Sequence, residues 1–512
     1  MEQLSAMDAS FAYMEKSTTP MHIGGLGIYD PSTAPGGAVG FKDILKYLEG
    51  RLDGARIFRQ KMVRVPLDLD HPYWVEDENF DLEYHVRHIA LPQPGDWRQL
   101  CILASRIYAR PLDMDRPLWE YTVIEGLDNV EGVPKGSFAL VQKTHHAAID
   151  GKSGMELAMA LHDLDAKLKP RKFDRDWQPE KTPNPLALLA KAQVNNIVNP
   201  VRGLRNLQNL LPMPKRVFDM RKQFTQRDDA KGNAPKTRFN KKLSAHRVFD
   251  GREFALTDIK KIRTKFPGAT VNDVMLAVVG GSLHKYLKAK KDLPEKTLKI
   301  GAPVSVRDEN DKDSAGNQVT MMTVGGGTHL ASAAERLEFV MRETQRSKAM
   351  TEAIGAKTLM EISGAMPAGL TAAGTKMMAG LADRFNPAVN TVLTNVPGPM
   401  YKMYLAGAEM VKSFGMGILA EGQGIFHVVT SYNGDVILTF LGDRDIVPDP
   451  EFYAQCIQKS FDDLMKAVPT KKAKKPAAKK NKADKKPATK RKARIAPSAA
   501  TAGRMRNKAT AK

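Results

Sequence analysis

The stretch His145-His146-Ala147-Ala148-Ile149-Asp150-Gly151 decides the fold and the site of this chain. It follows residues 137–144, SFALVQKT, a run that favours an extended strand. Residues 155–164, which come next, have apolar side chains at helical spacing. Side chains alternate along a strand, so we expect His145 and His146 to point to opposite faces. One histidine can then enter a reaction cleft while the other supports the turn.

Two other interpretations of this stretch fail on the residues themselves. Zinc needs ligands that converge, whereas adjacent histidines on a strand diverge, so no metal site is expected. Gly151-Lys152-Ser153 resembles the end of a phosphate-binding loop, but His146 occupies the position of the required upstream glycine. A pair of hydrogen-bonded structural histidines is the plain alternative, and the full HHxxxDG spacing at the end of a strand favours catalysis over it.

The HHxxxDG spacing resembles the active-site motif of the coenzyme A-dependent acyltransferase superfamily, whose fold is that of chloramphenicol acetyltransferase. Within it, the chain resembles the bacterial wax ester synthase/acyl-CoA:diacylglycerol acyltransferases. The resemblance covers about residues 1–467. Five further blocks carry it in the same order: residues 4–11, LSAMDASF; 116–120, RPLWE; 269–274, ATVNDV; 303–307, PVSVR, with 316–318, GNQ; and 394–399, TNVPGP.

The resemblance implies a mixed α/β fold with mixed sheets. Two chloramphenicol acetyltransferase-like domains are expected, with the active-site tunnel at their interface. A chain of 512 residues is also too long for one typical core. We expect residues 1–170 to form the first domain, 171–244 a helical crossover linker and 245–468 the second domain. Residues 469–512 are expected to be a disordered tail.

The function that the resemblance implies is transfer of a fatty acyl group from acyl-CoA to an alcohol. The acceptor is diacylglycerol, giving triacylglycerol, or a long-chain fatty alcohol, giving a wax ester. Acyl-CoA is a co-substrate, and no cofactor or metal is expected. A histidine near its ordinary pKa of about 6.5 can accept the alcohol proton at neutral pH. The resemblance assigns this general-base role to His146.

Two other classes of function stay open. A stand-alone condensation domain of a peptide synthetase shares HHxxxDG, although the chain shows no carrier or adenylation domain and the five other blocks favour the lipid enzymes. A non-catalytic protein, tethering lipid inclusions or nucleic acid, is the second alternative. The intact motif positions weigh against it.

The residues around the base support the turn or the substrate pocket. His145 orients the loop or lines the pocket. Asp150 holds the turn through an ion pair, with Arg307 as the candidate partner, or is an ordinary turn carboxylate. Gly151 permits a close backbone approach or a positive φ.

Two further blocks supply candidate site residues. Asn272 lies at the start of an expected helix over 271–287, where its amide and the helix dipole would stabilise an oxyanion. The alternative is that Thr270 or Asn272 simply caps the helix. Asp273 fits a stabilising first-turn acid. Three residues of the RPLWE block line the acyl channel or pack in the core: Pro117, Leu118 and Trp119.

The net charge of +21 resides mainly in the tail. Residues 471–512 hold 17 basic residues and one acidic residue, or +16, which leaves +5 for the rest. Such a Lys/Ala/Pro-rich segment cannot bury apolar surface. It would attract an anionic membrane or lipid-inclusion surface, or nucleic acid, unless it serves only as a solvated tail.

The same composition suggests where the protein works. The chain begins with no signal-peptide pattern and has no apolar run long enough to span a bilayer. Its two cysteines, Cys101 and Cys456, are far apart, which favours a reducing compartment. We therefore expect a cytoplasmic protein, peripheral on the inner face of the plasma membrane or on lipid inclusions.

Overall fold

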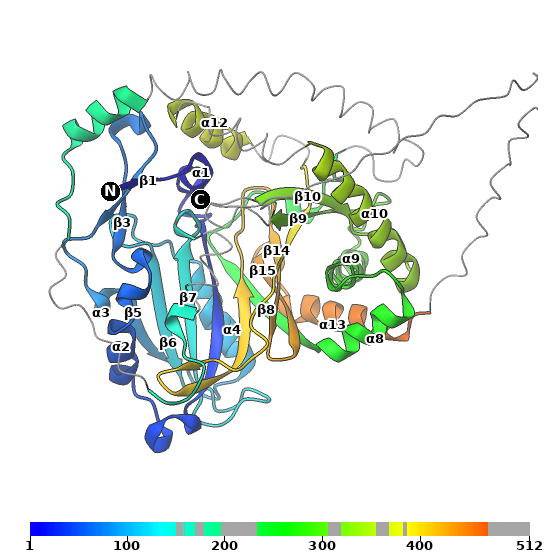
Figure 1. The fold of residues 1–512 in the computed structure, drawn as a ribbon. Coiled ribbons are helices and arrows are strands. Elements are labelled where there is room, and N and C mark those ends of the chain that lie inside the picture. Colours follow the sequence, from blue (N-terminus) through cyan, green and yellow to red (C-terminus); the bar gives the residue numbers. More distant parts are fainter. Residues whose placement is uncertain are drawn as a thin grey trace, which may run out of the picture. The chain divides into compact units, whose positions relative to one another are not determined.

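Two mixed six-stranded sheets form the framework of the chain (Figure 1). This computed structural model describes residues 1–149, 157, 159–168, 179–195, 233–305, 319–354, 368–381 and 387–468. Asp150, Gly151 and Arg307 lie outside these residues, as do the tail, most of the predicted linker and residues 155, 156 and 158 of the helix expected over 155–164. The predicted mixed α/β fold is confirmed.

The first sheet contains the strand that delivers the histidines. Its order is β12-β13-β2-β7-β6-β5, and only the β5–β6 pair is parallel. The central strand β7 is buried along nearly its whole length, as its run of apolar residues predicts. The strands are β2 (His22–Asp30), β5 (Val86–Ala90), β6 (Trp119–Glu125), β7 (Phe138–His145), β12 (Tyr404–Leu405) and β13 (Ala408–Met416).

Helices and a small sheet accompany the first sheet. Helix α2 (Phe41–Glu49) buries Ile44 and Leu48 four residues apart, so one apolar stripe faces the core. Helix α4 (Trp97–Tyr108) packs against β7 and against β8 of the second sheet. The small sheet has the order β1-β4-β3. The remaining elements here are α1 (Ala6–Met14), α3 (Leu82–His85), β1 (Glu2–Gln3), β3 (Gln60–Val63) and β4 (Tyr73–Glu76).

The second sheet has the order β10-β9-β11-β14-β15-β8, with β11 parallel to both of its neighbours. Asn433-Gly434 joins β14 to β15 with φ of 46° and 100°, the positive values that the Asn-Gly pair of a type I′ hairpin turn adopts. The strands are β8 (Arg247–Ala255), β9 (Lys299–Ser305), β10 (Val319–Gly325), β11 (Thr391–Val396), β14 (Ile425–Tyr432) and β15 (Asp435–Asp443).

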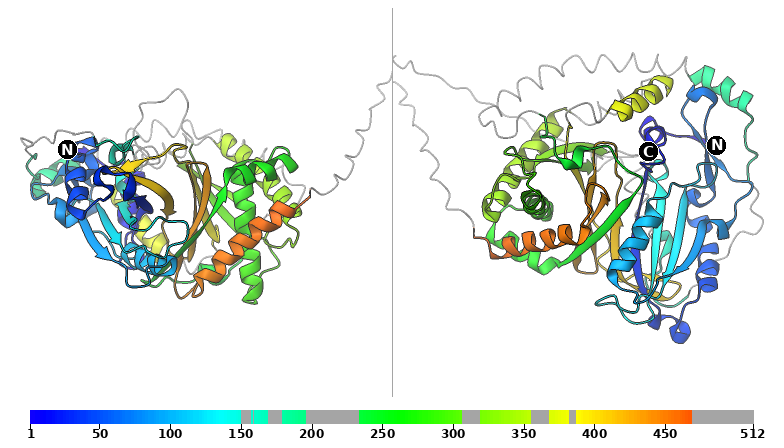
Figure 2. Two further views of the ribbon diagram at one scale, coloured as in Figure 1. Left: turned by 90° about the horizontal axis from the view of Figure 1, so that it is seen from below. Right: turned by 180° about the vertical axis from the view of Figure 1, so that it is seen from behind.

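Four helices cover the face of the second sheet that is turned away from the first (Figures 1 and 2). They are α8 (Leu256–Lys265), α9 (Val271–Ala289), α10 (Ala333–Ile354) and α13 (Pro450–Lys466). Helix α9 is buried over most of its length and packs against the other three. A further helix, α12 (Ala368–Leu381), packs on α1 instead. Among the described helices, none is both long and apolar enough to cross a bilayer.

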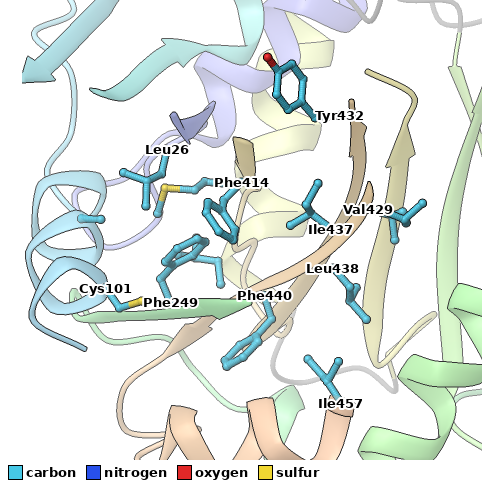
Figure 3. Close-up of a cluster of buried hydrophobic side chains, with 14 of the residues drawn as sticks. Leu26, Cys101, Phe249, Phe414, Val429, Tyr432, Ile437, Leu438, Phe440 and Ile457 are labelled. Atoms are coloured by element: carbon cyan, nitrogen blue, oxygen red, sulfur yellow. The ribbon is translucent and has the colours of Figure 1, made fainter. Parts of the chain in front are cut away.

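Strand β13 crosses from the second half of the sequence into the first sheet. It pairs with β2 from Glu409 to Met416. Its Phe414 packs in a continuous core with Leu26 of β2 and Ile437 of β15, as Figure 3 shows. We predicted that 245–468 would form the second domain, and β12 and β13 depart from that boundary. Strand β13 pairs with the edge of β2 opposite β7 and so satisfies the backbone groups of that edge.

Candidate active site

The histidine pair sits where β7 gives way to a 3₁₀ turn, η6 (His146–Ala148). The backbone N–H of His145 donates to the carbonyl of Leu118 at 2.9 Å. The N–H of His146 donates to the carbonyl of Met21 at 2.8 Å. Two separate segments therefore fix the backbone on which both imidazoles are carried.

His145 is completely buried and acts as a support for this turn. Its Nδ1 accepts a hydrogen bond from the N–H of Ala147 at 3.1 Å, so the ring proton is on Nε2. That Nε2 lies 2.9 Å from a carboxylate oxygen of Glu15. The same oxygen, Oε2, accepts the N–H of Met21 at 2.7 Å. Of the two predicted roles for His145, the geometry supports orientation of the loop.

The side chain of His146 has different surroundings from that of His145, in agreement with the prediction that the two point in different directions. Its ring stacks on Phe11 of α1, with centroids 3.9 Å apart and an interplanar angle of 14°. Its Nδ1 is buried and makes no hydrogen bond with any described residue. Burial lowers the pKa of His146 to about 4 because desolvation disfavours the imidazolium. The expectation of an ordinary pKa near 6.5 is therefore wrong, and the imidazole is neutral at pH 7.

The RPLWE block packs behind the turn. Leu118 is fully buried in an apolar cluster that also contains Ala147 of the turn and Ala372 of α12. Trp119 belongs to the main core, and its indole N–H donates to the carbonyl of Phe58 at 3.0 Å. Pro117 is buried as well. Burial and this bond favour core packing for Trp119, whereas Leu118 lies close to the histidine turn.

The start of α9 forms a second group of predicted residues. Thr270 is the N-cap: its hydroxyl accepts the N–H of Asp273 at 3.1 Å, and the Asp273 carboxylate accepts the N–H of Thr270 at 2.9 Å. The predicted stabilising role of Asp273 is supported, and Asn272 is not the cap. Instead, the Asn272 side-chain oxygen accepts a long 3.5 Å hydrogen bond from Asn395 of β11.

This contact leaves the Asn272 amide group to donate elsewhere. The two asparagines come from the ATVNDV and TNVPGP blocks, which lie more than 100 residues apart in the sequence. The structure thus joins two of the blocks. It also joins LSAMDASF to HHAAIDG through the stacking of Phe11 on His146. Within the described residues, no hydrogen bond connects the Asn272 pair to the histidine turn.

Glu15, Phe11 and Asn395 contact predicted site residues, although the sequence assigned them no role. Phe11 belongs to the LSAMDASF block and Asn395 to the TNVPGP block. Glu15 directly follows helix α1, and no local pattern pairs it with a histidine 130 residues later. In the described part of the chain, no group of three or more His, Cys, Asp or Glu side chains is arranged to hold a metal ion.

Glu15→Gln is expected to lower kcat about tenfold with little change in KM for acyl-CoA. The variant keeps the size of the side chain but exchanges charge-assisted hydrogen bonds for neutral ones, a difference of about 1 kcal/mol. Steady-state kinetics with a melting curve checks this. Wild-type kcat in the folded variant would show that the Glu15–His145 contact has no part in the reaction.

Comparison with known proteins agrees with the motif order. Residues 4–275 match the wax ester synthase/diacylglycerol acyltransferase catalytic domain, and residues 315–465 match the C-terminal domain of the same family. A candidate diacylglycerol O-acyltransferase of Mycobacterium tuberculosis is 32% identical over 450 residues, covering 88% of this chain and 87% of that protein. The O-acyltransferase WSD of Acinetobacter baylyi is 30% identical over 463 residues, covering 88% and 93%.

A solved structure gives the same answer for the fold. The wax ester synthase/diacylglycerol acyltransferase from Marinobacter aquaeolei VT8 superposes with a TM-score of 0.63 and 25% sequence identity, covering 90% of this chain and 98% of that one. The predicted fold and the motif-based resemblance are both confirmed. Matched along most of its length by sequence and by structure, the chain belongs to the wax ester synthase/diacylglycerol acyltransferase family.

Proposed function

We propose that this protein transfers a fatty acyl group from acyl-CoA to the hydroxyl of diacylglycerol or of a long-chain fatty alcohol, with His146 as the general base. The observation that carries the base assignment is the state of His146. The ring is neutral at pH 7, the backbone N–H is bonded to Met21, and Nδ1 has no hydrogen-bond partner among the described residues. The names of the relatives support the choice of acceptors.

The reaction follows from these groups. The alcohol gives its proton to His146 as its oxygen attacks the thioester carbonyl and forms a tetrahedral intermediate. The carbon–sulfur bond then breaks, and the imidazolium returns the proton to the departing thiolate. No acyl-enzyme is required, because the thioester is already activated. A pKa of about 4 makes His146 a weak base, so its cation must be stabilised in the transition state.

His145 and Glu15 hold the turn that carries His146, and Glu15 contacts the His145 ring and not that of His146. We assign oxyanion stabilisation to Asn272, whose oxygen faces Asn395 and whose amide hydrogens stay available. Asp150 would hold the turn, with Arg307 as its ion-pair partner. Gly151, which has no side chain, would let the substrate approach the backbone closely. Leu118 would approach the acyl chain. The tunnel at the interface of the two domains belongs to the same proposal.

The test offers palmitoyl-CoA to the purified protein with diacylglycerol and hexadecanol in parallel. Free coenzyme A should appear together with triacylglycerol, wax ester or both, as identified by mass spectrometry. Absence of coenzyme A release with either acceptor would contradict an enzyme of this class and favour the non-catalytic tether. Release with neither ester formed would mean that the acceptor has been misassigned.

The basic tail is proposed to bring the enzyme to an anionic lipid surface on the cytoplasmic side of the membrane or on lipid inclusions. Deleting residues 471–512 should leave turnover on detergent-dispersed substrate within about twofold, because the tail lies beyond α13. It should weaken binding to anionic liposomes most at low salt, at about 1 kcal/mol per basic residue near the membrane.

Sedimentation with anionic and neutral liposomes checks this, the neutral vesicles being the control. If the truncated protein keeps its affinity for anionic liposomes but loses affinity for DNA, the tail is a nucleic-acid tether.

A further inference from the structure

Arg247 is a buried charge at the start of β8 that the proposed reaction does not use. Its side chain is 3% exposed, and that of Asp443, directly opposite on β15, is 1% exposed. Their charged atoms lie 3.6 Å apart. The guanidinium also donates to the carbonyls of Ser244 at 2.7 Å and His246 at 3.2 Å. The fourth acceptor is the backbone carbonyl of Thr18, so three segments of the chain contribute acceptors to one arginine.

The contact with Thr18 reaches across to the other half of the sequence. The second terminal nitrogen of Arg247 donates to the Thr18 backbone carbonyl. Thr18 lies in the segment 15–21, which links α1 to β2. A second contact between the same regions joins Lys16 to Glu421 at 3.8 Å. Two residues from the second half of the sequence, Arg247 and Glu421, therefore contact this short segment.

Segment 15–21 is the one that holds the histidine turn. Its first residue, Glu15, binds the His145 ring. Its last residue, Met21, accepts the backbone N–H of His146. The segment is closed on itself by the bond from the N–H of Met21 to Glu15 and by paired backbone bonds between Lys16 and Thr19. These bonds connect Thr18 to both of the residues that contact the histidine pair.

We infer that Arg247 is a positioning residue through which the second half of the chain holds the histidine turn in its reactive geometry. The coupling runs from Arg247 to the Thr18 carbonyl, through segment 15–21, and on to His145 and His146. Its effect on catalysis rests on the proposed role of His146, whereas the mechanical coupling stands on the contacts alone.

An arginine suits this task better than a lysine. The planar fork presents several donors in fixed directions, so one side chain can bind Ser244 and His246 with one nitrogen and Thr18 with the other. An ammonium is a single point and cannot span these acceptors. Arg247→Lys therefore keeps the buried charge opposite Asp443 and removes the guanidinium hydrogen bond to the Thr18 carbonyl.

The experiment compares Arg247→Lys with Arg252→Lys by hydrogen exchange and kinetics on the full-length protein. Arg252 is the matched control: it lies on the same strand and pairs with an aspartate, Asp250, at 3.0 Å. Arg247→Lys should speed exchange of the Met21 and His146 amides about tenfold or more, because their bonds open when the segment loosens. The kcat should fall about tenfold at nearly constant KM, since misplacement of catalytic groups mainly affects the chemical step. The control should change neither.

Faster exchange confined to residues around 244–247 and 443 would overturn the inference, because it would make Arg247 a local support of the second sheet. If Arg247→Lys does not fold, the double variant Arg247→Met/Asp443→Asn removes both buried charges together and is measured in the same way. Exchange at Met21 and His146 that rises without any loss of kcat would also overturn the inference, because Arg247 would then hold the segment without positioning the reacting group. The base role of His146 is tested separately by His146→Ala, so the two proposals fail separately.

Discussion

His146→Ala is expected to lower kcat by about 10²–10⁴-fold, the range typical of a positioned general base. Its Nδ1 is buried and makes no hydrogen bond with any described residue, so removal of the ring leaves no partner unpaired at that atom. The loss of stacking on Phe11 should lower the melting temperature by only a few degrees. Single-turnover measurement of coenzyme A release in the folded variant checks the rate.

The matched control is His88→Ala. His88 is an exposed histidine that also stacks on a phenylalanine, Phe41, at 4.7 Å. It should keep wild-type kcat. A His146→Ala protein that retains more than about a tenth of wild-type kcat would contradict the base assignment, since that loss is smaller than a general base contributes.

The pH profile offers an independent check of the same residue. Burial lowers the pKa of His146 to about 4. The neutral, proton-accepting form therefore predominates at all pH values above about 4, and kcat/KM should fall only as the pH drops through that value. A steep loss of kcat/KM between pH 7 and 6 would instead mean that the base titrates with an ordinary histidine pKa. The lowered pKa of the buried His146 side chain would then not be the pKa that governs the reaction.

Local patterns allowed much of this protein to be predicted. The strand that ends at the histidines, the Asn433-Gly434 hairpin and the first-turn acid Asp273 all depend on residues within a few positions of one another. Such signals arise from backbone sterics and short hydrogen bonds, which the sequence states directly. The ordered blocks then supplied the family, because six short motifs in one order are far more specific than any one of them.

Features that depend on distant contacts could not be predicted in this way. Strand β13 reads as a strand, but nothing in its residues says that β2 is its partner. Glu15 is an ordinary acid until folding places it 2.9 Å from His145. The pKa of His146 likewise reflects the packing of α1 over the turn. Tertiary contacts and burial set these properties, and the spacing of residues along the sequence does not reveal them.

Asn272→Ala is expected to lower kcat by about 10²–10³-fold while KM for acyl-CoA changes little, because a donor to the oxyanion acts where charge develops. Alanine is a better helix former than asparagine, so α9 should not be weakened. Asn272→Asp should be slower still, since it places negative charge near the oxyanion and keeps the shape of the side chain. Pre-steady-state release of coenzyme A separates the chemical step from binding.

The neighbouring Thr270→Ala variant is the control that isolates catalysis from helix capping. Thr270 caps α9 with its hydroxyl, so its loss should cost about 1 kcal/mol of stability. The kcat of this variant should stay near that of the wild type. Asn395→Ala should lie between the two, because Asn395 orients the Asn272 amide through one long hydrogen bond. If Asn272→Ala behaves like Thr270→Ala, with a lower melting temperature and unchanged kcat, Asn272 serves only the helix and the oxyanion must be stabilised by another group.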